Sequence, residues 1–454
     1  MFYIKIDDLM RQNLLHGGSQ KLDYEIRDIV KKAEQLEKLG KKIYWENIGD
    51  PILKNADVPD WIKEIVSELV MDNRSYGYCH SKGIIETRKF LAEKNNEIEG
   101  VQINYDDILF FNGLGDAIGK LYQFLNPYSR VIGPSPAYST HSAFEAAHSN
   151  KEPLTYNLDP DNNWYPDLDD LYLKVKYNPS IVGILVINPD NPTGVVYPES
   201  YLKRIVEIAK EFNLFVVSDE IYGNIIYNGN KTKRLSEVLG DVPGISLKGI
   251  SKEVPWPGSR CGWMEFYNRK SDRNFDDYCL ALENAKMVEV CCTTLPQRAI
   301  PRIFSHPKYH EYLKEKNESI ATRSNIIGSH FKNIDYIKFN KTNGAFYNTI
   351  VFQDGVLNNN QFLKIEDDKT RELAESWVQG VAKPDSRFVY YLLAAKGVCV
   401  VPLSSFQSNL LGFRITLLEE DPEVLHYTFE QIADAINEFC TSDKVMEAEP
   451  VKLV

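Results

Sequence analysis

Apolar residues in the first half of the chain gather in short runs that alternate with longer amphipathic stretches. Five runs lie at residues 108–111, 180–187, 214–218, 244–248 and 261–266. Short continuous runs are typical of strands buried on both faces, and the stretches between them have the spacing of helices. The pattern predicts an α/β fold with a mostly parallel sheet between helices. Ligands bind such sheets at the carboxyl ends of the strands, so the residues that follow each strand are the candidates for chemistry.

The pattern changes towards both ends of the chain. A helix over 26–38 and a short strand that ends in Gly-Asp-Pro precede the alternating region, and helix, strands near 336–340 and 344–351, and a polar stretch follow it. The polar residues 353–386 have the character of an insertion with a helix around 369–378. We therefore expect an N-terminal arm and part of a small domain over 1–59, a large domain over 60–319 and a smaller α+β domain over 320–454.

Composition and charge narrow the class of protein. The 454 residues are 43% hydrophobic with a net charge of -12, which argues against nucleic acid as a partner. No run approaches the ~20 apolar residues of a membrane helix, and residues 1–8 meet charge too early for a signal peptide. Seven irregularly spaced cysteines give neither a disulfide framework nor a metal pattern. These features predict a cytoplasmic protein without a metal site.

Two glycine- and proline-rich turns follow predicted strands. Asn112-Gly113-Leu114-Gly115 enters a helix, where glycine lets the backbone approach an anion and the helix N-terminus offers N–H groups to phosphate. Taken alone, this segment is better explained by a plain tight turn between strand and helix. The run Asn188-Pro189-Asp190-Asn191-Pro192-Thr193-Gly194 holds the Asn191 amide at the end of another strand, because proline restricts both itself and the residue before it.

Charged residues follow the next two strands. Asp219, in Ser218-Asp219-Glu220-Ile221-Tyr222, ends a buried strand, where a carboxylate needs a cationic partner unless it caps a helix. Lys252 stands eight residues before Arg260, across a turn with proline and glycine. A lysine partly buried beside cations loses its proton and attacks an aldehyde, although a solvated surface lysine is the simpler alternative.

In combination these motifs resemble a known family. N-P-x-N-P-T-G, D-E-x-Y and S-K-x(7)-R-x-G, in this order, are similar to the class I and II aminotransferases of pyridoxal-phosphate (PLP) fold type I, over about residues 22–440. The segments around Asn47-Ile48-Gly49, Ile250-Ser251-Lys252 and Gly262-Trp263 resemble the alanine-aminotransferase-like subgroup. Gly249 in place of a phosphate-binding serine, the segment 401–407 without two usual glycines, and the insertion depart from the pattern.

The resemblance implies a role for each matching residue. Lys252 would hold PLP as a Schiff base and move the proton, Asp219 would pair with the pyridine nitrogen, and Tyr222 would bind the ring oxygen. The remaining cofactor contacts would come from Asn191, a stacked Tyr138, and a phosphate site of Gly113, Leu114, Gly115, Ser251, Arg260 and Tyr78. Tyr78 would reach the neighbouring subunit of a homodimer. The substrate carboxylate would meet Arg414, with Gly49 and Asn191 beside it.

The implied reaction is a ping-pong transamination. The amino group would pass from an L-amino acid, alanine or another small neutral one, to a 2-oxo acid such as 2-oxoglutarate. Aspartate or aromatic donors, a PLP-dependent carbon–sulfur β-lyase and a non-catalytic PLP-binding regulator are the alternatives, with a dinucleotide-dependent dehydrogenase as a more distant one. A lyase would release pyruvate and ammonia without an acceptor, and a regulator would add a DNA-binding domain, for which the chain has no basic face.

Overall fold

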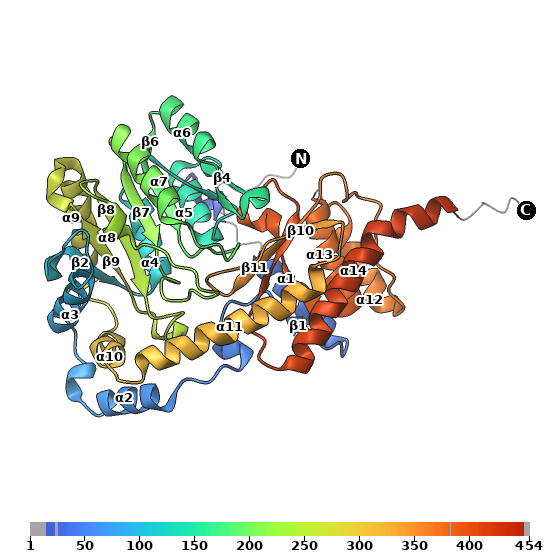
Figure 1. Cartoon of the computed structure of the whole chain (residues 1–454), viewed down its shortest axis with the longest axis horizontal. Coiled ribbons are helices and arrows are strands. Elements are labelled where there is room, and N and C mark those ends of the chain that lie inside the picture. Colours follow the sequence, from blue (N-terminus) through green and yellow to red (C-terminus); the bar gives the residue numbers. More distant parts are fainter. Residues whose placement is uncertain (1–14, 23–25, 382, 449–454) are drawn as a thin grey trace, which may run out of the picture.

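A large, mostly parallel sheet lies between helices in the left-hand part of the molecule as Figure 1 shows it. The computed structural model describes residues 15–22, 26–381 and 383–448, so the N-terminal segment 1–8 lies outside the described residues. Within them the sheet has eight strands in the order β2-β9-β8-β7-β6-β3-β4-β5. Their bounds are β2 Ile108–Phe111, β3 Arg130–Ser135, β4 Thr155–Asp159, β5 Tyr165–Pro166, β6 Ile181–Ile187, β7 Phe215–Asp219, β8 Gly244–Gly249 and β9 Gly262–Tyr267.

The five strands predicted from apolar runs are all present, displaced by no more than a residue or so at their ends. The pairs β4–β3, β3–β6, β6–β7 and β7–β8 are parallel. Strand β5 runs antiparallel to β4, and β9 runs antiparallel to both β8 and β2. The apolar runs did not predict β3 and β4. Arg130, Gly133 and Pro134 interrupt β3, and polar residues alternate with apolar ones in β4.

Helices cover both faces of this sheet. In β2, Leu109 and Phe111 face one hydrophobic cluster while Ile108 and Phe110 face another, as expected for strands with no solvent side. The first cluster packs against α4 (Leu114–Gln123) and α9 (Arg273–Val288). The second packs against a larger set of helices: α2 Asp60–Val70, α3 Ile85–Asn96, α6 Leu168–Tyr177, α7 Glu199–Glu211, α8 Leu235–Val238 and α10 Thr294–Phe304.

A smaller domain is built on an antiparallel sheet in the order β10-β11-β14-β13. Its strands are β10 Ile337–Phe339, β11 Tyr347–Phe352, β13 Val401–Pro402 and β14 Gly412–Thr416. Around it lie α12 Asp368–Val378, α13 Pro384–Lys396 and α14 Pro422–Ala448. The predicted helix of the polar insertion is α12, and the insertion packs into this domain through Leu357, Leu363 and Ile365.

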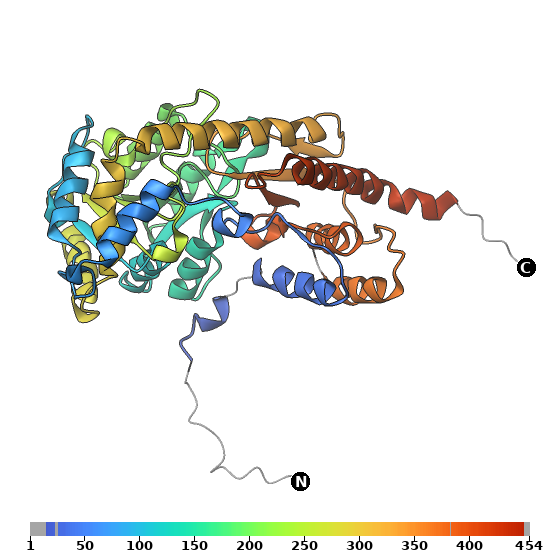
Figure 2. The ribbon, with the colours of Figure 1, turned by 90° about the horizontal axis from the view of Figure 1, so that it is seen from below.

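The N-terminal residues join the smaller domain. Helix α1 (Ile26–Lys38) places Ile29, Ala33 and Leu36 in its core, and β1 (Tyr44–Trp45) pairs with β12 (Val398–Cys399). Helix α11 (Tyr309–Phe331) spans from the large domain to the small one, as Figures 1 and 2 both show. The expected domain boundaries at 59/60 and 319/320 remain a proposal, and the second falls inside this helix. No helix in the described ranges has the length and apolar character needed to cross a membrane.

Candidate active site

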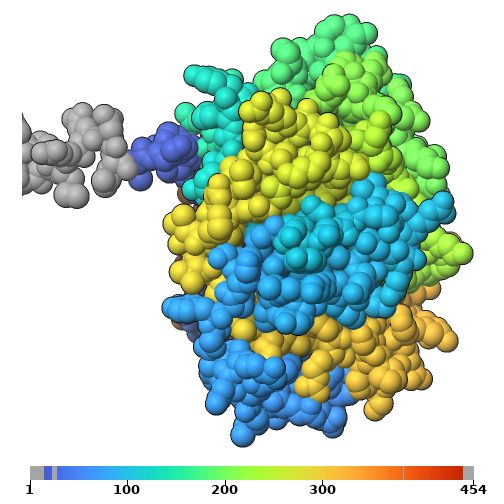
Figure 3. All heavy atoms as spheres, turned by 90° about the vertical axis from the view of Figure 1, so that its left-hand side faces the viewer, coloured from blue at the N-terminus to red at the C-terminus, as the bar shows by residue number. Residues whose placement is uncertain are grey.

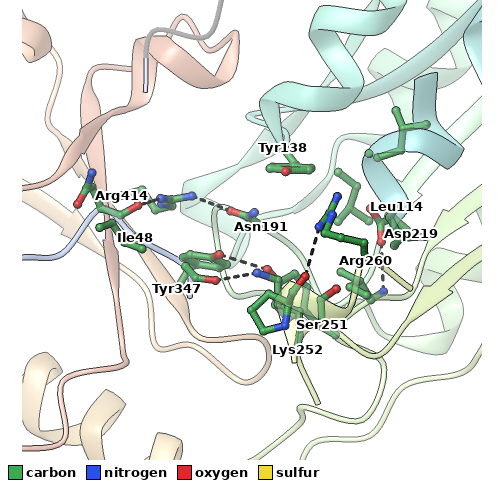
Figure 4. A pocket seen from close by; sticks show the side chains of 18 of the residues that line it. Ile48, Leu114, Tyr138, Asn191, Asp219, Ser251, Lys252, Arg260, Tyr347 and Arg414 are labelled. Atoms are coloured by element: carbon green, nitrogen blue, oxygen red, sulfur yellow. Dashed lines mark hydrogen bonds between the residues drawn. The ribbon is translucent and has the colours of Figure 1, made fainter. Parts of the chain in front are cut away.

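A cavity of about 380 Å³ opens where the carboxyl ends of β6, β7 and β8 meet the smaller domain. Its walls come from segments that lie far apart in the sequence, which Figure 4 shows converging on one space. The lining residues are Val30, Asn47, Ile48, Gly49, Leu114, Gly115, Ile118, Tyr138, Ile187, Asn191, Asp219, Ile221, Tyr222, Ser251, Lys252, Pro257, Arg260, Tyr347 and Arg414.

Lys252 enters the cavity from the irregular segment that follows β8. Its Nζ donates a hydrogen bond to the carbonyl oxygen of Gly49 at 2.7 Å, so the amine lies against the N-terminal wall of the cavity. The lysine is three residues past the end of the strand. Gly249, which departs from the family pattern, lies close to the next strand, and a Cβ there would come within 3.0 Å of the Cys261 carbonyl oxygen.

Asp219 lies at the end of β7 with 3% of its surface exposed. Its Oδ1 accepts from the backbone N–H of Ile221 at 3.1 Å, and its Oδ2 is 3.0 Å from Nε2 of His141. His141 is on α5 (Ser139–Ser149), far away in the sequence, and its Nδ1 is buried without a partner in the described part of the chain. The carboxylate is therefore held in place from both sides.

Two tyrosines meet beside the lysine. The hydroxyl of Tyr222 donates to that of Tyr347, on β11, at 3.2 Å. Burial, and then the neighbouring Tyr347, raise the pKa of Tyr222 well above its ordinary value, so the phenol stays protonated. Gly49 is also required here, since a Cβ at this position would lie 1.8 Å from the Tyr347 hydroxyl oxygen.

Arg414 extends from β14 into the opposite end of the cavity. Its Nη1 donates to Oδ1 of Asn191 at 3.2 Å and its Nη2 to the carbonyl oxygen of Asn47 at 2.5 Å. The guanidinium carbon lies 4.5 Å from the ring centre of Tyr347 and 5.0 Å from that of Phe406. Nε is buried and lacks a hydrogen-bond partner in the described residues. This end of the cavity presents a fixed cation that suits a carboxylate.

The N-terminus of α4 forms an anion-binding corner. Leu114 and Gly115 are its first residues, whose N–H groups have no acceptor within the helix. Gly113 precedes them at φ 83° and ψ 165°, a backbone region that is essentially restricted to glycine, and a Cβ there would lie 2.7 Å from Nη2 of Arg260. The guanidinium of Arg260 and the residue Ser251 complete this corner of the cavity.

The structure brings most of the predicted site residues together. Gly49, Leu114, Gly115, Tyr138, Asn191, Asp219, Tyr222, Ser251, Lys252, Arg260 and Arg414 all line the cavity, and Gly113 borders it against Arg260. Tyr78 does not line the cavity, and 87% of its surface is exposed. The sequence reasoning missed His141 and Tyr347, which lie outside the recognised motifs, and gave no role to Asn47 within a segment that it did single out.

These residues fit the cofactor that the resemblance implies. The glycine cradle, the free helix N–H groups and Arg260 suit a phosphate. The buried carboxylate of Asp219 suits a protonated ring nitrogen, and the protonated Tyr222 and the amide of Asn191 suit a ring oxygen. Lys252 supplies a primary amine for an aldehyde. No cluster of three or more metal-ligating side chains occurs among the described residues.

Comparison with known proteins supports the same family that the sequence motifs and the cavity indicate. Residues 46–432 match the family described as aminotransferase class I and II. An uncharacterized aminotransferase of Methanocaldococcus jannaschii is 54% identical over 430 residues, covering 95% of this chain and 99% of that protein. The glutamate-pyruvate aminotransferase of Escherichia coli is 33% identical over 280 residues, 61% of this chain and 67% of that protein. The alanine aminotransferase of Pyrococcus furiosus superposes with a TM-score of 0.80 at 27% identity, covering 93% of this chain and 99% of that one.

Proposed function

Because this chain belongs to the class I and II aminotransferases, which are pyridoxal-phosphate-dependent transaminases of fold type I, we propose that it takes its amino group from alanine or another small neutral L-amino acid. The acceptor in this proposal is a 2-oxo acid such as 2-oxoglutarate. The name of the E. coli relative supports alanine and 2-oxoglutarate as the substrate pair, since glutamate and pyruvate are the products of the transfer between them.

The charge of the cavity is the observation that carries this choice of donor. Within the described residues its cationic side chains are Lys252, Arg260 and Arg414. Arg260 lies at the phosphate corner and Lys252 is the candidate amine, so Arg414 alone remains for the substrate. One cation suits the single carboxylate of a neutral donor, whereas the second carboxylate of aspartate would have no cationic partner among these residues. The same charge count applies to 2-oxoglutarate, so the proposed acceptor is supported by the name of the E. coli relative and not by the charge of the cavity.

The proposed work of Lys252 is to hold the cofactor and to move a proton. When bound, the cofactor withdraws the electron pair that remains after Cα loses its proton. Lys252 would be the base that accepts and later donates this proton, and Asp219, held by His141, would pair with the ring nitrogen of the cofactor. In this proposal the same lysine in the same cavity serves both half-reactions. The amino donor and the oxo acid acceptor would therefore bind one after the other, which is ping-pong order.

Arg414 orients the donor in this proposal. Its side chain is fixed by Asn191, by the Asn47 carbonyl oxygen and by two aromatic rings. Arg414 therefore loses little additional conformational entropy when it binds a carboxylate. Ile48 and Tyr347 line the same end of the cavity. In this proposal the short apolar side chain of the donor lies beside them.

A homodimer is the proposed assembly. An apolar patch of Met71, Tyr76, Tyr78, Met287, Val288 and Val290 is exposed on the described chain. The segments that carry it are joined by the Arg298–Asp72 ion pair and by Thr294 Oγ1, which donates to the Gly77 carbonyl oxygen at 2.7 Å. Figure 3 shows these two parts of the chain adjoining on one face. A second copy would cover the patch and bring Tyr78 towards its neighbour's phosphate corner.

A panel of single amino acids tests the proposed donor. Holoenzyme is mixed with alanine, valine, aspartate, glutamate or tyrosine, and the first-order rate of 2-oxo acid formation is measured without an acceptor. Alanine should react faster than aspartate and tyrosine by at least roughly tenfold, about 1.4 kcal/mol of discrimination. Faster reaction with aspartate would contradict the proposal. Pyruvate and ammonia released repeatedly from cysteine, without an acceptor, would indicate a β-lyase instead.

A further inference from the structure

The backbone of the catalytic segment is held by a side chain from the interdomain helix. The carbonyl oxygens of Lys252 and Glu253 lie in the irregular segment after β8, where buried acceptors need donors from outside regular structure. Lys316 Nζ donates to both, at 2.5 Å and 2.9 Å. No backbone N–H in the described part of the chain donates to either oxygen. Lys316 is thus the donor that anchors the residue carrying the active amine.

Lys316 is one of several residues on a single face of α11 that grip this segment. Tyr309, Tyr312 and Lys316 are spaced by three and four residues, so their side chains project from the same side of the helix. The Tyr312 hydroxyl donates to the Glu253 carbonyl oxygen at 3.1 Å, and the Tyr309 hydroxyl donates to Glu253 Oε1 at 3.1 Å. Asn224 donates to the other carboxyl oxygen at 2.6 Å. Both the backbone and the side chain next to Lys252 are therefore fixed.

The same helix reaches the sheet that carries Arg414. Arg323 Nε donates to the carbonyl oxygen of Leu417, three residues beyond Arg414, at 2.7 Å. Ser324 shares a hydrogen bond of 2.7 Å with Thr342. Figures 1 and 2 show α11 as one continuous helix between the two domains. Helix α11 therefore connects the backbone of Lys252 to the smaller domain, which carries Arg414.

The protonation of Lys316 does not interrupt this contact. Burial, with Lys252 and Arg323 adding to it and Glu253 and Glu420 opposing it, lowers the pKa of Lys316 to about 7. An ammonium group has three N–H donors and a neutral amine has two. Either form can serve two carbonyl oxygens at once.

We propose that Lys316 is a positioning residue, which places the Lys252 amine by holding its backbone carbonyl from α11. The inference rests on the proposed role of Lys252 as the amine that binds the cofactor and moves the proton. Displacement of a reacting group by ~1 Å can lower a rate on the order of 100-fold. Lys316 touches neither the substrate-binding Arg414 nor the phosphate corner, so its effect should fall on the rate rather than on binding.

Replacement by methionine tests the proposal, because Lys316→Met keeps the length of the side chain and removes its donors. We expect kcat to fall roughly 10- to 100-fold while KM for the amino donor changes much less. The rate at which added PLP attaches to the apoenzyme, followed by the growth of its visible absorbance, should also fall. Lys316→Arg, which restores donors, should recover part of both rates. Tyr312→Phe, which leaves the Lys252 carbonyl bond intact, should have a smaller effect.

A structural role alone would give a different result. Urea unfolding of each variant separates positioning from loss of fold, and Lys316→Leu, which also lacks donors, replaces the methionine variant if that protein does not fold. Unchanged kcat and attachment rate in Lys316→Met, or equal losses in the methionine and arginine variants, would overturn the proposal. If wild-type protein attaches PLP but transaminates no amino acid, the proposed function fails, while the attachment rates still decide the role of Lys316.

Discussion

At the scale of single residues, Arg414 shows how this site fixes a flexible side chain. Asn191 and the Asn47 carbonyl oxygen accept from its terminal nitrogens, and two aromatic rings flank the guanidinium. Planar, two-point binding of a carboxylate is a property of arginine that lysine lacks. In the proposed function, the geometry of this residue sets how the carboxylate of a donor is oriented in the cavity.

Replacing this arginine by lysine tests that dependence. For Arg414→Lys we expect kcat/KM for the amino donor to fall about 10- to 100-fold, since hydrogen bonds to charged groups contribute roughly 1.5–3 kcal/mol. Affinity for PLP, measured by fluorescence titration, should stay the same. Arg371→Lys, an exposed arginine of the same domain, is the matched control. A wild-type kcat/KM in Arg414→Lys would show that the carboxylate binds elsewhere.

The residue before Asn191 gives a prediction on stability and pH. Burial raises the pKa of Asp190 from its ordinary 3.8 to about 7, although Thr193 donates two hydrogen bonds that favour the charged form. The folded state thus binds the proton more tightly than the unfolded state. The stabilisation is complete below pH 3.8 and is lost as the pH rises to about 7, with a slope of up to roughly 1.4 kcal/mol per pH unit.

Asp190→Asn removes this titration. The free energy of unfolding in urea, measured from pH 4 to pH 8, should decrease less steeply for the variant than for the wild type across the acidic part of that range. The variant should consequently gain stability relative to the wild type as the pH rises towards 7. Parallel curves for the two proteins would mean that Asp190 is already ionised in the folded state.

The sequence identified those residues of the cavity that lie within a recognisable motif. Lys252, Asp219 and Asn191 each lie at or just after the end of a strand, within a recognisable motif, and the structure gathers them in one cavity. His141 and Tyr347 reach the same space from α5 and β11. Their contacts depend on tertiary packing that no local pattern encodes. The Arg414–Asn191 hydrogen bond likewise joins residues 223 positions apart.

At the scale of elements, strand existence was easier to predict than strand direction. Runs such as Ile181–Ile187 are apolar because both faces of the sheet are covered. Strand β9 returns antiparallel to β8 after the irregular connection that carries Lys252 and Arg260. The periodicity of apolar residues does not report strand direction. Strand β3, with arginine, glycine and proline, lacked the apolar signal altogether.

The N-terminal segment is tied to β14 by a buried charge network. Lys54 Nζ lies 2.8 Å from Glu46 Oε1, and Thr416 Oγ1 donates to Glu46 Oε2 at 2.5 Å. Lys54→Met should lower the free energy of unfolding by about 3–5 kcal/mol, because it leaves a buried carboxyl without its cation. Urea unfolding measures the loss. The double variant Glu46→Gln/Lys54→Met should be much less destabilised, and equal losses in the two would mean that the charge pairing contributes little.

At the scale of the whole molecule, the apolar patch defined above predicts self-association. Val288 is 86% exposed and Met71 84% exposed on the isolated chain. Light scattering on the wild type should give twice the mass of 52.1 kDa. Val288→Glu should shift the mass towards one chain and weaken PLP binding, since Tyr78 would then lack a neighbour. Tyr177→Glu, exposed on α6, should stay dimeric. A wild-type mass of one chain would contradict the proposed assembly.

The most direct test of the whole account is the absorbance spectrum of the PLP-loaded protein before and after addition of L-alanine, with Lys252→Ala beside it. We predict a visible band from cofactor attached to the wild-type protein, its loss on adding alanine, and about one pyruvate released per chain. The Lys252→Ala protein should lack the band and release no pyruvate. A wild type without the band, or a Lys252→Ala variant that reacts as the wild type does, would contradict the assignment of Lys252.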